Sequence, residues 1–406
     1  MDQIIKSPLE NDLYKWNMMN VVFKNFNDRQ TVWRFKCRNA NVKFTPEMIN
    51  EIRHQIDLYC ANVCYTEDEI GYLRNTFPWL SEGFLNFLRY WRPNRNEIKI
   101  NEGNIQAYND CGLAIEASGM WLNVSWYEMP ILAIVSEVYN TFTYGDGAKD
   151  IEFQKRTIEK FNKILDGTYN VGTFSEFGLR RRYSSAMQDW LIKYIVDQKI
   201  PGFVGTSNVY LAKKYGVKAV GTTAHEMPMC MMTDPEFNPA YVNKRLMEVW
   251  TQEYGVENGI YLTDVIGREA FLMDFNKRYA TLYSGLRHDS GDPIEWGEAM
   301  IAHYQKLKID PKMKTLLFSD ALDFERATSI KKHFDGRINV AFGIGTYLAG
   351  IQDEKPLNIV MKVTTCNGHP TCKLTDNPEK AMGDPMCIDY IRRAVDWKIR
   401  FKYYES

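Results

Sequence analysis

From about residue 150 onward the chain repeats one pattern: a short apolar run, a polar or glycine-containing motif, and then a segment with helical spacing of apolar residues. Short apolar runs bounded by turn residues are typical of buried strands, and apolar positions three and four residues apart are typical of helices. Units of strand then helix connect parallel strands through right-handed crossovers. The pattern predicts seven parallel strands, each followed by a polar or glycine motif, in the strand-plus-motif segments 171–178, 202–208, 217–226, 259–267, 281–292, 315–322 and 338–346.

Nearly every predicted strand ends in residues capable of chemistry. In a barrel of parallel strands these ends meet at one mouth, where the active sites of that architecture lie. An open, doubly wound sheet is the alternative, but it would bring only a few of the seven ends together. The pattern therefore favours a parallel α/β barrel.

The first 140 residues follow a mixed pattern. Segments 31–39 and 104–119 alternate like strands, whereas 45–63 and 126–142 have helical spacing. We expect three parts: an N-terminal α/β domain over 1–140, a barrel over 141–350, and a basic, aromatic C-terminal segment over 351–406 that packs on the first domain.

Composition and charge narrow the function classes. An aromatic content of 14% fits a folded chain. The formal net charge of −1 gives no general electrostatic reason to bind nucleic acid or a membrane. No apolar stretch is long enough for a membrane span, and the first residues lack the pattern of a signal peptide. The eight scattered cysteines are expected to be reduced thiols of a cytoplasmic enzyme, without a zinc site.

The motif "LRHDSGDP" (286–293) gathers polar residues in one strand-to-helix turn. Arg287 can bind a carboxylate or a phosphate through two hydrogen bonds, and Asp289 suits sugar hydroxyls. Ser290 or Asp292 could instead cap the next helix. Capping explains one polar residue but not the whole cluster, so we predict a binding site here.

Three further strand ends carry weaker signals. "FGIGTYLAG" (342–350) is glycine-rich, and backbone N–H groups at such a turn can hold a phosphate. "FSDAL" (318–322) offers Asp320 to a ribose or a Mg²⁺-bound diphosphate, although capping explains it equally well. "EFGLRRRYS" (176–184) has three consecutive arginines, of which at most two can serve a site. A solvated basic turn is the alternative there, for Arg182 in particular.

"GTTAHEMP" (221–228) places His225 at a strand end, where a core histidine is the ordinary interpretation. Zinc partners at suitable spacing are missing, and no G-x-S-x-G motif indicates a serine hydrolase. In the same way, Tyr14 in "NDLYKWNM" (11–18) is most simply a half-buried aromatic at the start of a helix that Asn11 or Asp12 caps.

Taken together, seven motifs occur in the order found in the nicotinate phosphoribosyltransferases, a type II phosphoribosyltransferase family, and the chain resembles that family nearly end to end. They are "NDLYKWNM", "FSEFGLRRRYS", "FVGTSN", "GTTAHE", "LRHDSGDP", "LLFSDAL" and "FGIGTYL". The resemblance implies an irregular parallel α/β barrel beside a smaller α/β sandwich domain built from both chain ends. It also implies a homodimer with the site at the subunit interface.

The resemblance implies a reaction in NAD salvage. Nicotinate and 5-phosphoribosyl 1-pyrophosphate (PRPP) give nicotinate mononucleotide and diphosphate, while ATP is hydrolysed alongside and Mg²⁺ accompanies the diphosphate. The pyridine nitrogen already has a lone pair, so no protein base is needed. Catalysis then depends on positioning and on charge stabilisation.

The resemblance also assigns roles to particular residues. His225 is phosphorylated from ATP, because a neutral imidazole can attack a γ-phosphate, and Glu226 is a candidate to orient it. Arg287, Asp289 and Asp320 are the other catalytic candidates, with Arg287 binding either carboxylate or phosphate. The substrate-binding candidates are Tyr14 and Phe177 on the two faces of nicotinate, Arg180 and Arg181 for phosphate or carboxylate, Ser207, Thr222 for nicotinate, and Gly345 and Thr346 for the 5′-phosphate.

Several competing functions stay open from sequence. Nicotinamide phosphoribosyltransferases have an aspartate where Ser207 stands here, and such a carboxylate would repel nicotinate. A quinolinate phosphoribosyltransferase would have no use for the ATP-reactive histidine. A non-catalytic nucleotide-binding barrel would be expected to lack the arginines, Asp289 or His225. A barrel aldolase or isomerase would need a base such as Lys362.

Overall fold

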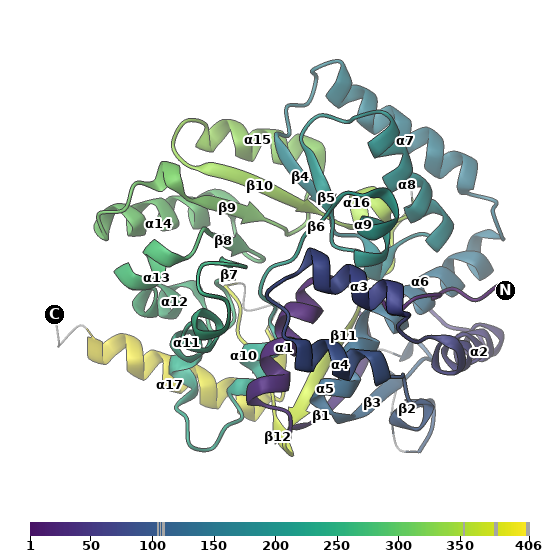
Figure 1. Cartoon of the computed structure of the whole chain (residues 1–406), viewed down its shortest axis with the longest axis horizontal. Helices are drawn as coiled ribbons and strands as arrows, with labels where there is room; N and C mark the ends of the chain where they lie inside the picture. Colours follow the sequence, from purple (N-terminus) through teal and green to yellow (C-terminus); the bar gives the residue numbers. More distant parts are fainter. Residues whose placement is uncertain (104, 106, 108–109, 352–353, 377–380, 403–406) are drawn as a thin grey trace. The chain divides into compact units, whose positions relative to one another are not determined.

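The structure is a computed structural model that describes residues 1–103, 105, 107, 110–351, 354–376 and 381–402. The chain divides into two compact units. The first unit consists of residues 1–221 and 344–362, and the second of residues 222–343 and 363–406 (Figure 1). Each unit is therefore built from two separate segments of the chain.

The first unit contains a mostly antiparallel sheet. Strand β1 (Gln30–Cys37) lies between β3 (Ile115–Met120) and β11 (Ile359–Cys366), and β2 (Ile98–Ile100) adds to β3. Alternate β1 side chains are buried, as the sequence alternation requires. The helices of this part are α1 (Tyr14–Asn25), α2 (Pro46–Asn62), α3 (Glu67–Thr76), α4 (Glu82–Tyr90), α5 (Trp121–Val124) and α6 (Glu128–Tyr144).

Three parallel strands complete the first unit. They are β4 (Thr173–Glu176), β5 (Phe203–Thr206) and β6 (Lys218–Ala219), in the order β6-β5-β4. Gly205 permits β5 and β6 to lie this close together, since a Cβ at residue 205 would lie 1.8 Å from the Lys218 carbonyl oxygen. The associated helices are α7 (Asp150–Leu165), α8 (Ser185–Asp197), α9 (Val209–Tyr215) and α16 (Thr346–Ala349).

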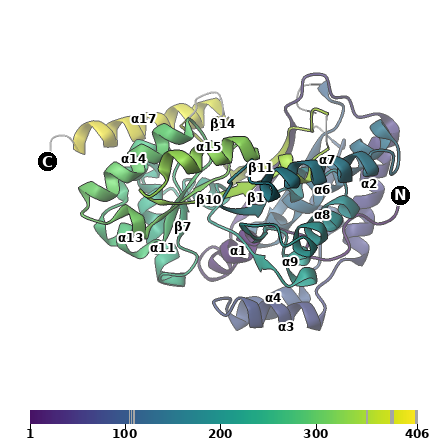
Figure 2. The same cartoon turned by 90° about the horizontal axis from the view of Figure 1, so that it is seen from above.

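The second unit is built on four parallel strands in the order β10-β9-β8-β7. Their bounds are β7 (Ile260–Leu262), β8 (Gly285–His288), β9 (Thr315–Phe318) and β10 (Asn339–Ile344). In Figure 2, helices of this unit lie along the strands. They are α10 (Glu226–Met231), α11 (Val242–Tyr254), α12 (Arg268–Asp274), α13 (Lys277–Leu282), α14 (Pro293–Lys306), α15 (Phe324–Phe334) and α17 (Pro385–Lys402).

All seven predicted strands are present, and each pair within a unit is parallel as expected. The strand predicted at 217–226 is only two residues long. The strand predicted at 104–119 begins at Ile115, and residues 104, 106 and 108–109 lie outside the described residues. The predicted cap of α1 is wrong. The helix begins after Leu13, while the Asn11 side-chain amide donates to the Trp126 carbonyl oxygen at 3.0 Å.

The C-terminal segment contributes residues to both units. Residues 354–362 belong to the first unit, whereas α17 packs within the second. The Lys398 ammonium donates to the Ala240 carbonyl oxygen at 2.8 Å and to Asp274 at 2.6 Å. Residues 352–353, 377–380 and 403–406 of the predicted C-terminal segment lie outside the described residues, and the division at residues 140 and 350 stays a prediction.

All eight cysteines are free thiols. Among the described residues, no helix combines the length and the apolar character that crossing a bilayer requires.

Candidate active site

The predicted site residues fall into two groups, one in each unit. In the second unit, Arg287 is a residue of β8, and three oxygen acceptors hold its guanidinium. It donates to Ser319 Oγ at 2.8 Å, to Thr222 Oγ1 at 2.9 Å and to Asp289 Oδ1 at 2.9 Å. Three residues that the sequence assigned separately, Thr222, Arg287 and Asp289, are thus joined by hydrogen bonds. A guanidinium fixed in this way is oriented before any ligand arrives.

His225 lies beside this arginine group, immediately before α10, and is 8% exposed. Its Nε2 is 2.8 Å from Asp264 Oδ1 and 2.9 Å from Lys373 Nζ, and its Nδ1 is 3.9 Å from Asp289 Oδ2. Asp264 also accepts a hydrogen bond from Ser290 Oγ at 2.7 Å. We call His225, Asp264, Asp289 and Lys373 the histidine cluster.

Burial and the Lys373 charge favour a neutral imidazole in the histidine cluster. Burial and the Lys373 ammonium lower the pKa of His225 below its ordinary value of 6.5, against the opposing pull of Asp264 and Asp289. Burial raises the pKa of Asp264, but Lys373 and His225 outweigh it and hold that pKa well below the usual range. The cluster therefore combines an ionised aspartate with an imidazole that keeps a lone pair at neutral pH.

We expect the Lys373→Met variant to raise the pKa of His225, because a cation that lowers it is removed. If the neutral imidazole accepts phosphate from ATP, labelling of the protein by γ-³²P-ATP should fall at low pH, and the midpoint of this fall in the original chain should lie below pH 6.5. In the variant the decline should begin at higher pH.

The matched control is Lys306→Met, which removes an exposed lysine of the same unit. In Lys306→Met, labelling should fall at the same pH as in the original chain. If the pH at which labelling falls is also unchanged in Lys373→Met, the electrostatic role of Lys373 is contradicted.

The histidine cluster has some of the composition of a metal site. Ligand atoms of His225, Asp264 and Asp289 lie within 4.8 Å of one another. The Lys373 ammonium lies 2.9 Å from His225 Nε2 and 3.6 Å from Asp264 Oδ2, so a metal ion would meet a second cation there. The donor set fits Mg²⁺ poorly, since Mg²⁺ prefers oxygen ligands in an octahedral arrangement.

In the first unit, Tyr14 and Arg180 both interact with the buried carboxylate of Glu128. The Tyr14 hydroxyl donates to Glu128 Oε2 at 3.1 Å. Glu128 is 1% exposed and pairs with Lys15 at 2.9 Å and with Lys362 at 3.1 Å. Burial raises the pKa of Glu128, but Lys15, Lys362 and Arg180 outweigh it and bring the pKa far below its ordinary value. Lys362 thus has an ion-pairing role, which removes the reason to regard it as an aldolase-type base.

Phe177 and the glycine turn lie together in the same unit. The Phe177 backbone N–H donates to the Ile344 carbonyl oxygen at 2.8 Å. A Cβ at Gly345 would lie 2.9 Å from the Phe177 carbonyl oxygen, so this approach requires glycine. Thr346 is the first residue of α16. The motifs at 176–184 and 342–350 are therefore in direct contact.

Ser207 is 5% exposed and lies beside the N-terminal motif. Its carbonyl oxygen accepts a hydrogen bond from the Leu13 backbone N–H at 3.0 Å, and Asp12 forms a β-bridge with Asn208. Burial raises the pKa of Asp12, although the positive charge of Arg180 opposes this. The Asp12 carboxyl is thus a neighbour of Ser207, which the sequence did not indicate.

The three consecutive arginines have different environments. Arg182 is 1% exposed and pairs with Glu10 at 3.0 Å and with Glu137 at 3.6 Å, so the solvated-turn alternative is wrong for this residue. Arg181 donates to the Ile359 carbonyl oxygen at 3.1 Å and to Asn358 at 3.0 Å. Burial, together with Arg180, lowers the pKa of Arg181 to about 9.

The remaining candidates have simpler positions. Asp292 caps α14 by accepting from the Glu295 backbone N–H at 2.8 Å, which confirms the capping alternative for that acid. Asp320 follows β9, and its negative charge raises the pKa of the buried His288, which burial lowers more strongly. Glu226 is 4% exposed in the first turn of α10 and therefore does not face solvent.

Comparisons with known proteins cover both units. The model of the nicotinate phosphoribosyltransferase (NAPRTase) N-terminal domain matches residues 9–136, and that of the NAPRTase family matches residues 173–398. A nicotinate phosphoribosyltransferase of Bordetella petrii is 39% identical over 395 residues, which is 96% of this chain and 98% of the relative. Nicotinate phosphoribosyltransferase 1 of Pseudomonas aeruginosa is 38% identical over 407 residues, covering 97% and 98%.

Solved structures agree with the sequence comparisons. The nicotinate phosphoribosyltransferase of Porphyromonas gingivalis has a TM-score of 0.89 at 33% identity, covering 97% of this chain and 100% of that chain. The Vibrio cholerae nicotinate phosphoribosyltransferase has a TM-score of 0.88 at 31% identity, covering 100% and 98%. This confirms the predicted fold class, an irregular parallel α/β barrel with a smaller α/β sandwich domain. The chain belongs to the nicotinate phosphoribosyltransferase family.

Proposed function

We propose that this chain is an enzyme that transfers the phosphoribosyl group of PRPP to nicotinate, forming nicotinate mononucleotide and diphosphate for NAD salvage. The observation that carries the proposal is its family membership over nearly the whole chain. The hydrogen-bonded group of Thr222, Arg287 and Asp289 supports it, because these are the residue types that anionic substrates and a ribose require.

The chemistry asks the protein to position and to stabilise charge. The nicotinate ring nitrogen attacks C1 of the ribosyl group, the new C–N bond forms, and the bond from C1 to the diphosphate oxygen breaks. Arg287, already oriented by three acceptors, would hold a carboxylate or phosphate oxygen without reorganisation. The Asp289 carboxylate would accept hydrogen bonds from the ribose hydroxyls.

ATP is proposed to act through His225. A neutral imidazole nitrogen attacks the γ-phosphorus, the bond to the ADP oxygen breaks, and a phosphohistidine forms that water later hydrolyses. The low pKa of His225 favours the neutral form. Nε2 lies 2.8 Å from the Asp264 carboxylate, which can only accept a hydrogen bond, and 2.9 Å from the Lys373 ammonium, which can only donate one. The attacking lone pair is on whichever ring nitrogen does not carry the proton.

Mg²⁺ and a second subunit belong to the same proposal. A magnesium ion would neutralise the diphosphate, and the carboxylate oxygens of Asp320 at the end of β9 are of the type it prefers. The homodimer, with Tyr14 reaching nicotinate across the interface, is inferred from the family resemblance.

The test is a mononucleotide-formation assay with nicotinate or nicotinamide, each with and without ATP. We expect nicotinate to be used at a kcat/KM at least about tenfold above that for nicotinamide, and ATP to stimulate the reaction. An arginine of the site can pair with the carboxylate of nicotinate but not with the neutral carboxamide of nicotinamide, and a difference of about 1.4 kcal/mol is a factor of ten.

The Ser207→Asp variant sharpens this test, because it introduces the carboxylate found in nicotinamide-specific relatives, and nicotinate use should fall. Ser207→Asn has a similar size without the charge and serves as the control. If nicotinamide is the better substrate of the original chain, the nicotinamide-specific alternative replaces the proposal.

A further inference from the structure

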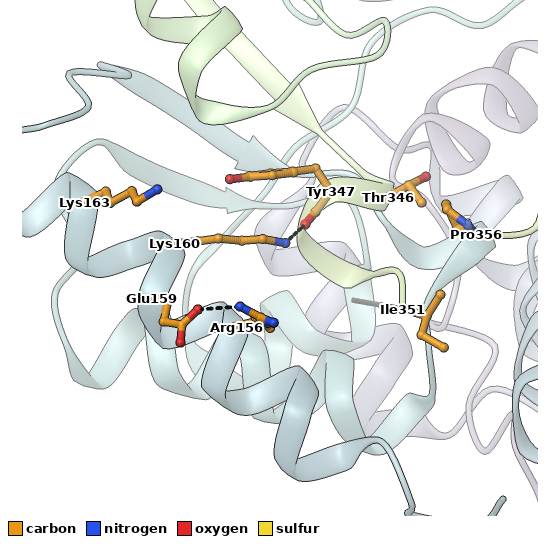
Figure 3. Close-up of a pocket in the computed structure, with 8 residues that line it drawn as sticks. All are labelled: Arg156, Glu159, Lys160, Lys163, Thr346, Tyr347, Ile351 and Pro356. Atoms are coloured by element: carbon orange, nitrogen blue, oxygen red, sulfur yellow. Dashed lines mark hydrogen bonds and ion pairs between the residues drawn. The ribbon is translucent and has the colours of Figure 1, made fainter. Parts of the chain in front are cut away.

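A cavity of about 540 Å³ lies on the first unit between helix α7 and the segment that follows β10 (Figure 3). Its walls are Arg156, Glu159, Lys160, Lys163, Thr346, Tyr347, Ile351 and Pro356. Apart from Thr346, none of these residues was predicted to bind substrate. The cavity therefore shares Thr346 with the predicted 5′-phosphate turn, but its other side chains form a second candidate binding site.

The α7 wall is positively charged. Arg156, Lys160 and Lys163 occur on successive turns of this helix, and Glu159 is the single acid in the lining. The Arg156 guanidinium uses Nε for Glu152 at 2.7 Å and one terminal nitrogen for Glu159 at 3.2 Å. The Lys163 ammonium lies over the Tyr169 ring at 5.6 Å. An anion in the cavity would be attracted by more cations than anions.

The facing wall is fixed and partly apolar. The Lys160 ammonium donates to the Tyr347 carbonyl oxygen at 2.7 Å and lies 4.1 Å from the centre of the Tyr347 ring. Figure 3 shows the Lys160 side chain reaching from α7 toward Tyr347, with Ile351 and Pro356 farther along the same wall. These contacts give the cavity a preformed shape, and its volume is in the range of about 300–1,000 Å³ that small-molecule sites occupy.

We infer that this cavity binds a mononucleotide, with the phosphate beside Lys163 and the base against Tyr347, Ile351 and Pro356. Cations on one wall and apolar surface on the other match a ligand that has a phosphate at one end and a flat, weakly polar body at the other. The inference does not depend on which reaction the chain catalyses.

The test is isothermal titration of AMP into the full-length protein and four variants. Lys163→Glu reverses an exposed charge of the cavity and should weaken AMP binding by about fivefold or more. Lys155→Glu makes the same change at an exposed α7 lysine outside the cavity and should leave the affinity unchanged. Tyr347→Ala tests the stacking wall, and AMP binding should weaken. Arg287→Ala tests the candidate active site, and the binding that depends on Lys163 should persist.

Adenosine and inorganic phosphate are the comparison ligands, and both should bind more weakly than AMP. An AMP affinity that is unchanged in Lys163→Glu would overturn the proposal, as would loss of the same binding in Arg287→Ala. Phosphate binding as tightly as AMP would show a simple anion site, and adenosine binding as tightly would show an apolar pocket. Either result would overturn the mononucleotide assignment.

Discussion

His225→Ala should abolish the stimulation of mononucleotide formation by ATP while leaving a slow ATP-independent transfer. The imidazole is the proposed acceptor of the γ-phosphate, and alanine has no atom that can accept it. The transfer itself needs no protein base. Positioning of the substrates by Arg287 and its hydrogen-bond partners should therefore still support some reaction. We expect the ratio of rates with and without ATP to fall to about 1.

Mononucleotide and ADP should be measured in the same samples, so that coupling is separated from overall rate. His333→Ala removes an exposed histidine of the same unit, paired with Glu298, and is the matched control. It should retain both ATP hydrolysis and stimulation. If His225→Ala still couples ATP hydrolysis to transfer, the phosphohistidine role is wrong.

Glu128→Gln should destabilise the first unit by about 3–5 kcal/mol, the range for breaking a buried ion pair by removing one partner. Glu128 is 1% exposed and forms ion pairs with both Lys15 and Lys362. A neutral amide would remove the carboxylate that Lys15 and Lys362 share, in a region that Arg180 also makes positive. Urea denaturation followed by tryptophan fluorescence would measure the loss, since Trp16 and Trp33 are buried in this unit.

The control for Glu128→Gln is Glu82→Gln, which removes the acid from an exposed pair with Arg74 in the same unit. An exposed pair contributes little to stability, so the loss should be much smaller than in Glu128→Gln. Equal losses in the two variants would mean that the buried triad of Lys15, Glu128 and Lys362 has no special stabilising role.

The strands were predictable because each carries its own apolar run and turn residues. Register and helix caps were less accessible, since they depend on contacts with distant segments. The start of α1 is an example: Asn11 looks like a cap, but its amide is engaged with Trp126, which is 115 residues away. The tertiary contact prevailed over the local capping preference.

The histidine cluster shows the same limit. Asp264 lies within the predicted segment 259–267, two residues after the end of β7, and a carboxylate at a strand end is a signal of a site that the sequence does contain. Lys373 offered none, because it reaches His225 from 148 residues later in the chain. The buried ion pairs of Arg182 could not be predicted either, since Glu10 and Glu137 lie far from Arg182 in the sequence. Charged residues at long separation have no periodic pattern that identifies them.

The division of the chain affects its synthesis. The first unit is complete only with residues 344–362, which leave the ribosome after all of 222–343 has emerged. Residues 1–221 must therefore wait without Gly345, the close partner of Phe177, while most of the second unit is already available to fold. The second unit in turn awaits Lys373, so the environment of His225 is completed only near the end of translation. A nascent chain released early would thus lack the charges that tune this histidine.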